Sequence, residues 1–352
     1  MPRVEWAMRE YLHAVGTGPK SNRDLTYDET RQVADLLLDQ TATELQHGAF
    51  LIALRNKGES PEELHGFVEA VRARSSVIAP RVEGLVDIGS PCDGRTESVI
   101  VSPFASIVAA AAGVPQVMSG APDMPPKHGV GIHEMLGALG MATDLKPNEV
   151  ERAIEETGFG YLNQEVFTPD LYALKQRREE MTLRSVFNTV EKMLNLASAP
   201  HHIIGLTHTP YMQRITGAME RLGYGKSFIV QGIEGNEDVQ TWRPSRLTIV
   251  EGGSTDESTL DPADFELERV EREELRAEDP LNESLERFLP VLEGVGTAAM
   301  RDLVAYNAGL RIWLGGGVDS MAAGIASARE AVTSGVALAT LRALQAQQAA
   351  VH

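Results

Sequence analysis

Residues 84–118, GLVDIGSPCDGRTESVIVSPFASIVAAAAGVPQVM, decide the expected fold. A short apolar run from Leu85 to Gly89 ends at a loop rich in glycine and proline. An alanine-rich segment, Ala105 to Ala112, then leads to a second short apolar run, Val114 to Met118. Apolar runs bounded by turn residues predict buried strands, and the alanine-rich segment predicts a helix between them. This stretch therefore predicts a strand, a loop, a helix and a strand in that order.

The same order of elements is expected again further along the chain. His202 to Gly205 and Ser227 to Gln231 have the pattern of short strands, and Tyr211 to Leu222 lies between them with the pattern of a helix. Alternation of strands and helices is typical of a mostly parallel sheet with helices on its faces. We therefore expect an α/β fold built on a mostly parallel central sheet.

Residues 25–74 predict a different kind of unit, made of helices joined by tight turns. Thr43 precedes Gln46 by three residues, which is a capping-box pattern, and Ser60 to Glu63 supplies an N-cap, a first-turn proline and two acidic residues. The charged segment Tyr172 to Leu196 interrupts the strand and helix alternation, and we expect it to be helical and to pack with this first unit. The sequence therefore predicts a small helical domain beside the α/β domain.

The remaining segments complete the expected domain organisation. Asp256 to Arg287 is dense in acidic residues, which predicts a solvated face or loop. Asp302 to Leu314 is expected to be a helix that stops at three glycines, and one long alanine-rich helix is expected from Ser320 onward. The domain boundaries that we expect are residues 1–80 and 170–198 for the helical domain, and residues 81–169 and 199–352 for the α/β domain.

Composition limits the compartment and the partners. The chain has 352 residues, a formal net charge of -18 and one cysteine, Cys92, so it contains no intramolecular disulfide. A single cysteine fits a reducing compartment, and neither a membrane span nor a secretory signal is expected from the sequence. These features predict a cytoplasmic protein with no membrane partner. The strong negative charge disfavours nucleic acid unless a local basic groove overrides it.

Two loops have the composition of anion-binding sites. Gly89 to Thr96 leaves a predicted strand and is followed by Ser102 near the start of a helix, so its backbone N–H groups could meet a phosphate; an ordinary strand-to-helix turn is the alternative. Pro125 to Gly131 places Lys127 on a flexible loop, where it could bind an anionic ligand or be an ordinary solvated lysine.

Two charged groups add further hypotheses. Glu234, Glu237 and Asp238 lie in a glycine-rich loop straight after a predicted strand, where carboxylate oxygens could bind a Mg2+ that accompanies phosphates. In an otherwise acidic protein, a local basic segment could instead contact the phosphates of a nucleic acid; its members are Lys175, Arg177, Arg178 and Arg184.

Several motifs together resemble the anthranilate phosphoribosyltransferase superfamily over nearly the whole chain. They are Ala49 to Glu63 in the helical unit, Arg184 to Asn188, Thr259 to Phe265, Tyr306 to Gly309 and Ala328 to Ala331. The resemblance implies a helical domain that forms a homodimer, an α/β domain, and phosphoribosyl pyrophosphate bound with Mg2+ between them. It also implies transfer of phosphoribose to a small aromatic amine such as anthranilate.

Carried over residue by residue, the resemblance assigns roles within this sequence. Gly89, Asp93, Ser102 and Lys127 would cradle the phosphates, and Arg178 would pair with the carboxylate of the aromatic acceptor. Glu237 and Asp238 would bind Mg2+. Two family glycines in the first loop are Pro91 and Cys92 here, and a proline removes a backbone donor that a phosphate would use.

The degraded loops leave other functions open. The sequence also resembles a divergent, phosphoribosyltransferase-like branch of the superfamily that lacks the activity and includes proteins that bind nucleic acid through a basic dimer groove. A different glycosyl or phosphorolytic activity is a third hypothesis. Among these hypotheses, phosphoribosyl transfer is the expected function.

Overall fold

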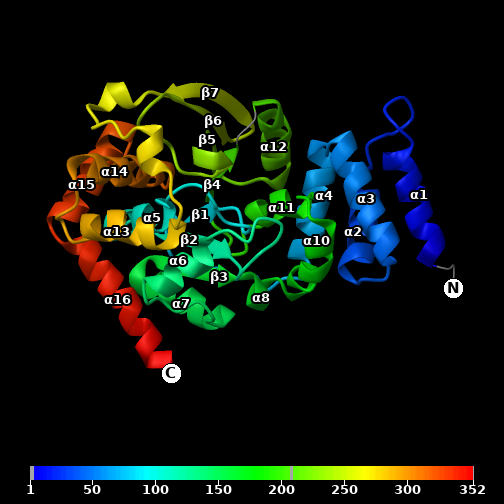
Figure 1. The fold of residues 1–352 in the computed structure, drawn as a ribbon, viewed down its shortest axis with the longest axis horizontal. Coiled ribbons are helices and arrows are strands. Elements are labelled where there is room, and N and C mark those ends of the chain that lie inside the picture. Colours follow the sequence, from blue (N-terminus) through cyan, green and yellow to red (C-terminus); the bar gives the residue numbers. More distant parts are fainter. Residues whose placement is uncertain (1–3, 207–208, 352) are drawn as a thin grey trace.

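The computed structural model describes residues 4–206 and 209–351, and its centre is a seven-stranded sheet (Figure 1). The strand order is β3-β2-β1-β4-β5-β6-β7. The first five strands in this order run parallel, and β6 and β7 are antiparallel additions at one edge. The mostly parallel sheet predicted from the sequence is therefore confirmed. The strands are β1 (Val86–Gly89), β2 (Gln116–Gly120), β3 (Phe159–Asn163), β4 (His201–Leu206), β5 (Lys226–Gln231), β6 (Ser245–Glu251) and β7 (Ser254–Leu260).

A helical bundle forms the N-terminal end of the molecule, to the right of the sheet in Figure 1. The capping box expected at Thr43 is present, with Gln46 as the reciprocal partner, and the N-cap expected at Ser60 is present and also forms a capping box with Glu63. These caps satisfy backbone donors that a helix start otherwise leaves unpaired, so each helix begins where the sequence predicts. The bundle helices are α1 (Val4–Gly16), α2 (Tyr27–Leu38), α3 (Glu44–Lys57) and α4 (Pro61–Arg72).

Two apolar cores lie on opposite faces of the sheet. Alternate residues of β4 enter different cores: Ile203 packs with the C-terminal helices, and Ile204 packs with the bundle. This alternation is the two-residue period of a strand that is covered on both faces. Helices of the α/β part include α5 (Ser102–Ala111), α6 (Ile132–Ala138), α7 (Pro147–Thr157), α12 (Thr209–Leu222), α13 (Pro280–Leu292) and α14 (Ala298–Leu314).

The segment between β3 and β4 packs with the bundle, as the sequence predicts. The rings of Phe67 and Phe187 meet edge to face, with centroids 5.7 Å apart. The segment is not one helix, however, because Thr182 adopts a left-handed conformation with φ 56° and ends α10. Its short helices are α8 (Gln164–Phe167), α9 (Pro169–Tyr172), α10 (Lys175–Met181), α11 (Phe187–Val190) and η1 (Glu191–Met193).

The C-terminal region corrects one expectation and confirms another. The single helix expected from Ser320 is two helices, α15 (Met321–Thr333) and α16 (Val336–Val351), because Gly335 lies between them with φ 79°. Most of the acidic segment is exposed, as predicted, and it includes edge strand β7 and two 3-10 turns, η3 (Pro262–Phe265) and η4 (Arg272–Leu275). Within the described ranges, no helix has the combined length and apolarity needed to cross a bilayer.

Candidate functional site

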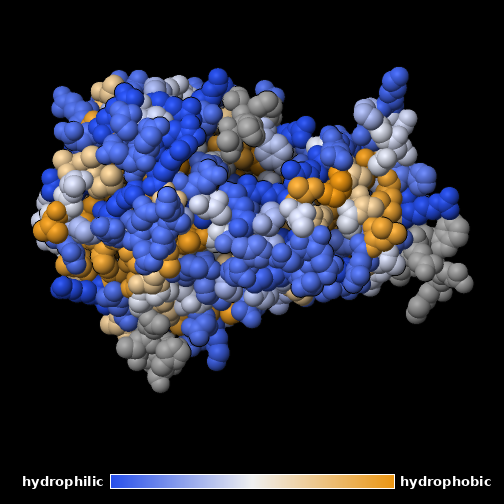
Figure 2. Space-filling view, viewed as in Figure 1, coloured by the Kyte–Doolittle hydropathy of each residue, from blue (hydrophilic) through white to orange (hydrophobic). Residues whose placement is uncertain are grey.

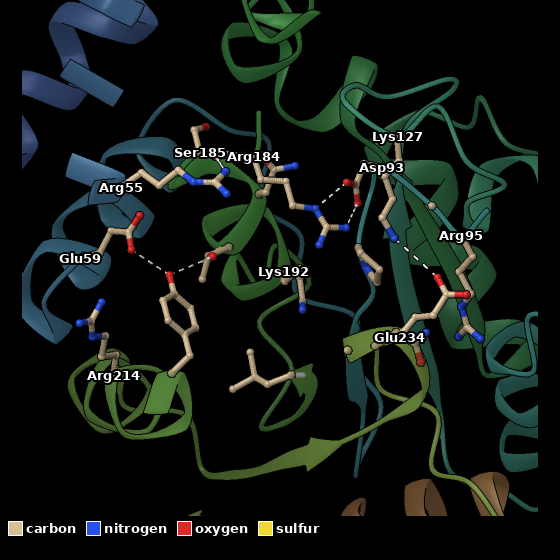
Figure 3. Close-up of a pocket in the computed structure, with 18 residues that line it drawn as sticks. Arg55, Glu59, Asp93, Arg95, Lys127, Arg184, Ser185, Lys192, Arg214 and Glu234 are labelled. Carbon is tan, nitrogen blue, oxygen red and sulfur yellow. Dashed lines mark hydrogen bonds and ion pairs between the residues drawn. The ribbon is translucent and has the colours of Figure 1, made fainter. Parts of the chain in front are cut away.

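A cavity of about 430 Å³ lies at the carboxyl ends of β1, β4 and β5, against the helical bundle (Figure 3). β2 pairs with one edge of β1 and β4 pairs with the other edge, so the strand order changes direction at β1. In open α/β sheets, ligands bind outside the carboxyl ends of the strands at such a change of direction. The position of the cavity alone therefore makes it the candidate site.

Cations dominate the lining of the cavity. Six cationic side chains and three acidic ones line it, although the whole chain has a formal charge of -18. A cavity that concentrates positive charge in this way favours an anionic ligand. The cations are Arg55, Arg95, Lys127, Arg184, Lys192 and Arg214, and the acids are Glu59, Asp93 and Glu234.

The loop after β1 contributes Asp93, which is held in place by an arginine. Both oxygens of Asp93 accept hydrogen bonds from the Arg184 guanidinium, each at 2.7 Å. Asp93 is buried, whereas 43% of the Arg184 side chain is exposed, so the arginine retains a face toward the cavity. Gly89 permits the close packing under this loop, because a Cβ there would lie 2.4 Å from the carbonyl oxygen of Lys192.

Lys192 lies in the middle of the labelled side chains in Figure 3. It is 8% exposed, and its Nζ donates a hydrogen bond to the carbonyl oxygen of Gly205 at 2.7 Å. Burial lowers the pKa of Lys192 to about 8, which still leaves the amine mostly protonated at neutral pH. Lys192 is therefore a buried cation at the wall of the cavity.

The helical side of the cavity is built around Tyr211 of α12. Its hydroxyl donates to Oε2 of Glu59 at 3.0 Å, and burial raises the pKa of Glu59. The Arg214 guanidinium lies 5.8 Å from the centre of the Tyr211 ring and packs on Gly58, where a Cβ would lie 2.1 Å from Nη1. Gly58 also has φ 82°, so this turn requires glycine on two grounds.

A second ion pair joins two loops at the other side of the cavity. Nζ of Lys127 lies 3.6 Å from Oε2 of Glu234, and Figure 3 shows the two side chains pointing toward one another. Both are partly exposed, so the pair contributes little to stability and can open when an anion approaches Lys127.

Residues 9–75 match the helical bundle domain of the glycosyl transferase family, and residues 83–338 match its α/β domain. The chain belongs to this glycosyl transferase family. The anthranilate phosphoribosyltransferase of Natronomonas pharaonis is 33% identical over 339 residues, which cover 96% of this chain and 99% of the relative. That of Haloarcula marismortui is 32% identical over 330 residues, 94% of this chain and 97% of the relative.

Solved structures of anthranilate phosphoribosyltransferases have the same fold as this chain. The anthranilate phosphoribosyltransferase of Thermus thermophilus has a TM-score of 0.83 at 28% identity, covering 97% of this chain and 99% of that one. The enzyme of Saccharomyces cerevisiae, solved with PRPP and Mg, has a TM-score of 0.85 at 20% identity, covering 99% and 100% of the two chains. At that lower identity the yeast structure supports the fold alone.

In this glycosyl transferase family member, the structure brings only some of the expected site residues to the cavity. Asp93 and Lys127 line it, and Gly89 lies beneath the loop that carries Asp93. Ser102 is fully buried at the start of α5, where its hydroxyl accepts a hydrogen bond from Arg311 at 2.8 Å and donates one to Glu237.

Arg178 does not line the cavity of this family member. Its two terminal guanidinium nitrogens donate to the Glu191 carboxylate at 2.9 and 3.3 Å, and both side chains are buried. The Nε–H of Arg178 has no hydrogen-bond partner, but the side chain is only 2% exposed, so an aromatic carboxylate could reach it only if the surrounding packing opened. The structure thus gives Arg178 an internal partner in place of the expected substrate.

The two acids expected to bind Mg2+ are also buried, which corrects their expected position in an exposed loop. The loop after β5 packs tightly on β4, because a Cβ at Gly205 would lie 1.7 Å from the carbonyl oxygen of Asn236. This packing is possible only with glycine at 205, and the segment that follows turns Glu237 and Asp238 into the interior.

Both acids have internal partners that do not fit a metal site. Asp238 accepts hydrogen bonds from Arg95, from Arg311 at 3.2 Å and from the backbone N–H of Ser102 at 3.1 Å. Oε1 of Glu237 accepts hydrogen bonds from the hydroxyls of Ser90 and Ser102. Among the described residues, no group of three or more acids, histidines or cysteines is placed to hold a metal ion. Oε2 of Glu237 is buried and has no hydrogen-bond partner, but Asp238 is occupied by two arginines and a backbone N–H, so the two acids do not together present the carboxylate ligands expected for Mg2+.

The four cations of the basic segment do not form one exposed face. Arg178 is paired with Glu191, Arg184 with Asp93, and Arg177 contacts Nδ1 of His47 at 3.2 Å. Lys175 donates to the carbonyl oxygen of Pro122 at 3.1 Å. Neither this arrangement nor the comparisons support the nucleic-acid alternative.

Several cavity residues were not singled out in the sequence as site residues. Arg55 and Glu59 lie at the end of α3 and in the turn after it, inside the motif that resembles the family's helical unit, so their place in that motif was an available signal. Lys192, Tyr211 and Arg214 carry no local signal, because only the packing of the bundle against the sheet brings them to one cavity.

Proposed function

We propose that this protein transfers a phosphoribosyl group from phosphoribosyl pyrophosphate to a small aromatic amine such as anthranilate. The observation that carries the proposal is the cation-rich cavity at the carboxyl ends of the parallel strands, in a chain whose curated relatives are anthranilate phosphoribosyltransferases. The location in the cytoplasm expected from the sequence is part of the same proposal.

The reaction requires positioning and charge stabilisation more than covalent chemistry. The bond between ribose C1 and a diphosphate oxygen breaks, the diphosphate leaves with the electron pair, a C1–N bond forms, and the amine loses a proton. Negative charge grows on the leaving diphosphate, so preorganised cations beside it lower the barrier. Arg184, Lys192 and Lys127 are suitably placed to supply that charge at the sheet side of the cavity.

The acceptor would occupy the helical side of the same cavity. Arg178 is committed to Glu191, so we assign the acceptor carboxylate to Arg214, which faces the cavity beside Tyr211. A guanidinium matches a carboxylate in a two-pronged geometry, and the neighbouring tyrosine supplies an aromatic surface. The donor and acceptor would then approach one another between the sheet and the bundle.

The test of this function is release of diphosphate that depends on both phosphoribosyl pyrophosphate and anthranilate. In Arg214→Gln we expect the KM for anthranilate to rise roughly 10- to 100-fold, as loss of a charge-assisted hydrogen bond predicts, with donor affinity nearly unchanged. Arg221→Gln is the matched control, because Arg221 is an exposed arginine near the end of the same helix. Absence of turnover with any aromatic amine tried would contradict the proposed function.

We also propose that the protein is a homodimer through its helical bundle. A shallow apolar groove between α1 and α3 is lined by Val15, Ala49, Ile52 and Ala53, and Leu45 at its side is 83% exposed. Figure 2 shows hydrophobic residues gathered over this end of the molecule. Contiguous apolar surface of this kind commonly marks a protein interface.

Multi-angle light scattering checks the oligomeric state. We expect twice the monomer mass for the wild type and a shift toward monomer for Leu45→Glu, because a carboxylate would be buried at the interface. Val295→Glu alters an equally apolar, 75% exposed residue outside the bundle and should leave the mass unchanged. A wild type that stays monomeric at all concentrations would refute the dimer.

A further inference from the structure

Several acidic side chains in and around the cavity are paired with cations of the same chain. Asp93 is neutralised by Arg184, Glu234 faces Lys127, and Asp238 is held between Arg95 and Arg311. Single oxygens of Glu234 and Glu237 have no hydrogen-bond partner. They belong to separate side chains, and no group of three or more acids, histidines or cysteines of residues 4–206 and 209–351 is placed to hold a metal ion. The cavity is left with an excess of fixed positive charge.

Lys192 is a buried cation of the cavity that has unused hydrogen-bonding capacity. An ammonium group has three N–H donors, and within the part of the chain that the structure describes, the Lys192 ammonium has one hydrogen-bond partner, the carbonyl oxygen of Gly205. It has no ion pair there with any carboxylate, although Glu237 and Asp93 lie near enough to act on its charge. A buried ammonium with two donors to spare needs a further acceptor, and the cavity is where one can enter.

Lys192 is also fixed in position. It belongs to the short turn η1, directly after Glu191, whose carboxylate is anchored by Arg178. The carbonyl oxygen of Lys192 lies against Gly89, so the residue packs under the loop that carries Asp93. Asp93 in turn accepts hydrogen bonds from Arg184. The ammonium and the Arg184 guanidinium therefore approach the cavity from one rigid wall.

We propose that Lys192, together with Arg184, binds the diphosphate of the donor directly and that this binding does not require a divalent metal ion. The inference rests on the proposed function, because it takes a diphosphate-bearing sugar as the ligand. A lysine ammonium binds phosphate oxygens as a point charge, and an arginine adds a planar fork of donors. Lys192 would thus supply positive charge of the kind that a metal ion otherwise supplies to the leaving group.

Isothermal titration calorimetry with inorganic diphosphate, and with phosphoribosyl pyrophosphate, tests the metal requirement on the full chain. We expect wild-type protein to bind both ligands in EDTA, with an affinity within about threefold of that in Mg2+, a difference under 1 kcal/mol. Binding that appears only when Mg2+ is added would overturn the inference and leave the proposed function standing. Absence of binding in both buffers would overturn the inference and the proposed function together.

Substitutions test the lysine itself. In EDTA, Lys192→Met should weaken diphosphate binding roughly 10- to 100-fold, whereas Lys192→Arg should keep most of the affinity because the positive charge remains. Lys146→Met removes an exposed lysine at the start of α7 and should bind as the wild type does. Thermal unfolding of each variant identifies loss of fold, and Lys192→Arg keeps the test decisive if Lys192→Met is unstable. Wild-type affinity in Lys192→Met would overturn the role of Lys192.

Discussion

Asp238→Ala is expected to lower the free energy of unfolding by about 3–5 kcal/mol, although Asp238 lies in a loop. Its carboxylate is fully buried between Arg95 and Arg311, and it also accepts a hydrogen bond from the backbone N–H of Ser102 at the start of α5. Removing it leaves two guanidinium groups buried without their counter-charge. Chemical denaturation of the purified variant, read by circular dichroism, measures the loss.

Two further variants separate charge from shape at this position. Asp238→Asn keeps the shape and part of the hydrogen bonding, so its loss of stability should be smaller than that of the alanine variant. Asp256→Ala removes an exposed acid of β7 and should change stability by no more than about 0.5 kcal/mol. If Asp238→Ala unfolds at the same denaturant concentration as wild type, the carboxylate is not the internal counter-ion that we describe.

The fold could be predicted because its signals are local. The strand, loop, helix and strand between Leu85 and Met118 follow from apolar runs and turn residues that are close in sequence, and the structure has them as β1, α5 and β2. Thr43 and Ser60 start their helices through side chains only three residues away. Where a local signal was passed over, as at Gly335, the predicted helix was too long.

The site was predicted less completely because burial and pairing are not local. Asp93 and Lys127 follow strands or precede helices in glycine-rich loops, and both line the cavity. The inward turn of Glu237 depends instead on close packing of its loop against Gly205 of a neighbouring strand. An acidic residue in a glycine-rich loop has the same sequence signature whether it faces solvent or arginines from distant elements, so the sequence could not distinguish these two environments.

Arg178→Met is the second substitution with a large expected effect, about 3–5 kcal/mol of lost stability, because it leaves Glu191 buried and unpaired. The double variant Arg178→Met/Glu191→Leu removes both charges and should recover most of that loss, since well-packed apolar residues often replace a buried ion pair at little cost. The difference between the double variant and the sum of the single variants gives the coupling energy of the pair.

The same substitution separates a structural role for Arg178 from a role in acceptor binding. Gln176→Met is the control, since it alters an exposed residue of the same helix and should leave stability within about 0.5 kcal/mol of wild type. Because Arg178 does not line the cavity, the folded double variant should bind anthranilate with a KM close to that of wild type, whereas Arg214→Gln should not. A double variant that is as stable as wild type but shows a KM for anthranilate raised tenfold or more would mean that the acceptor displaces Glu191 and pairs with Arg178. That result would assign the acceptor carboxylate to Arg178 and remove it from Arg214.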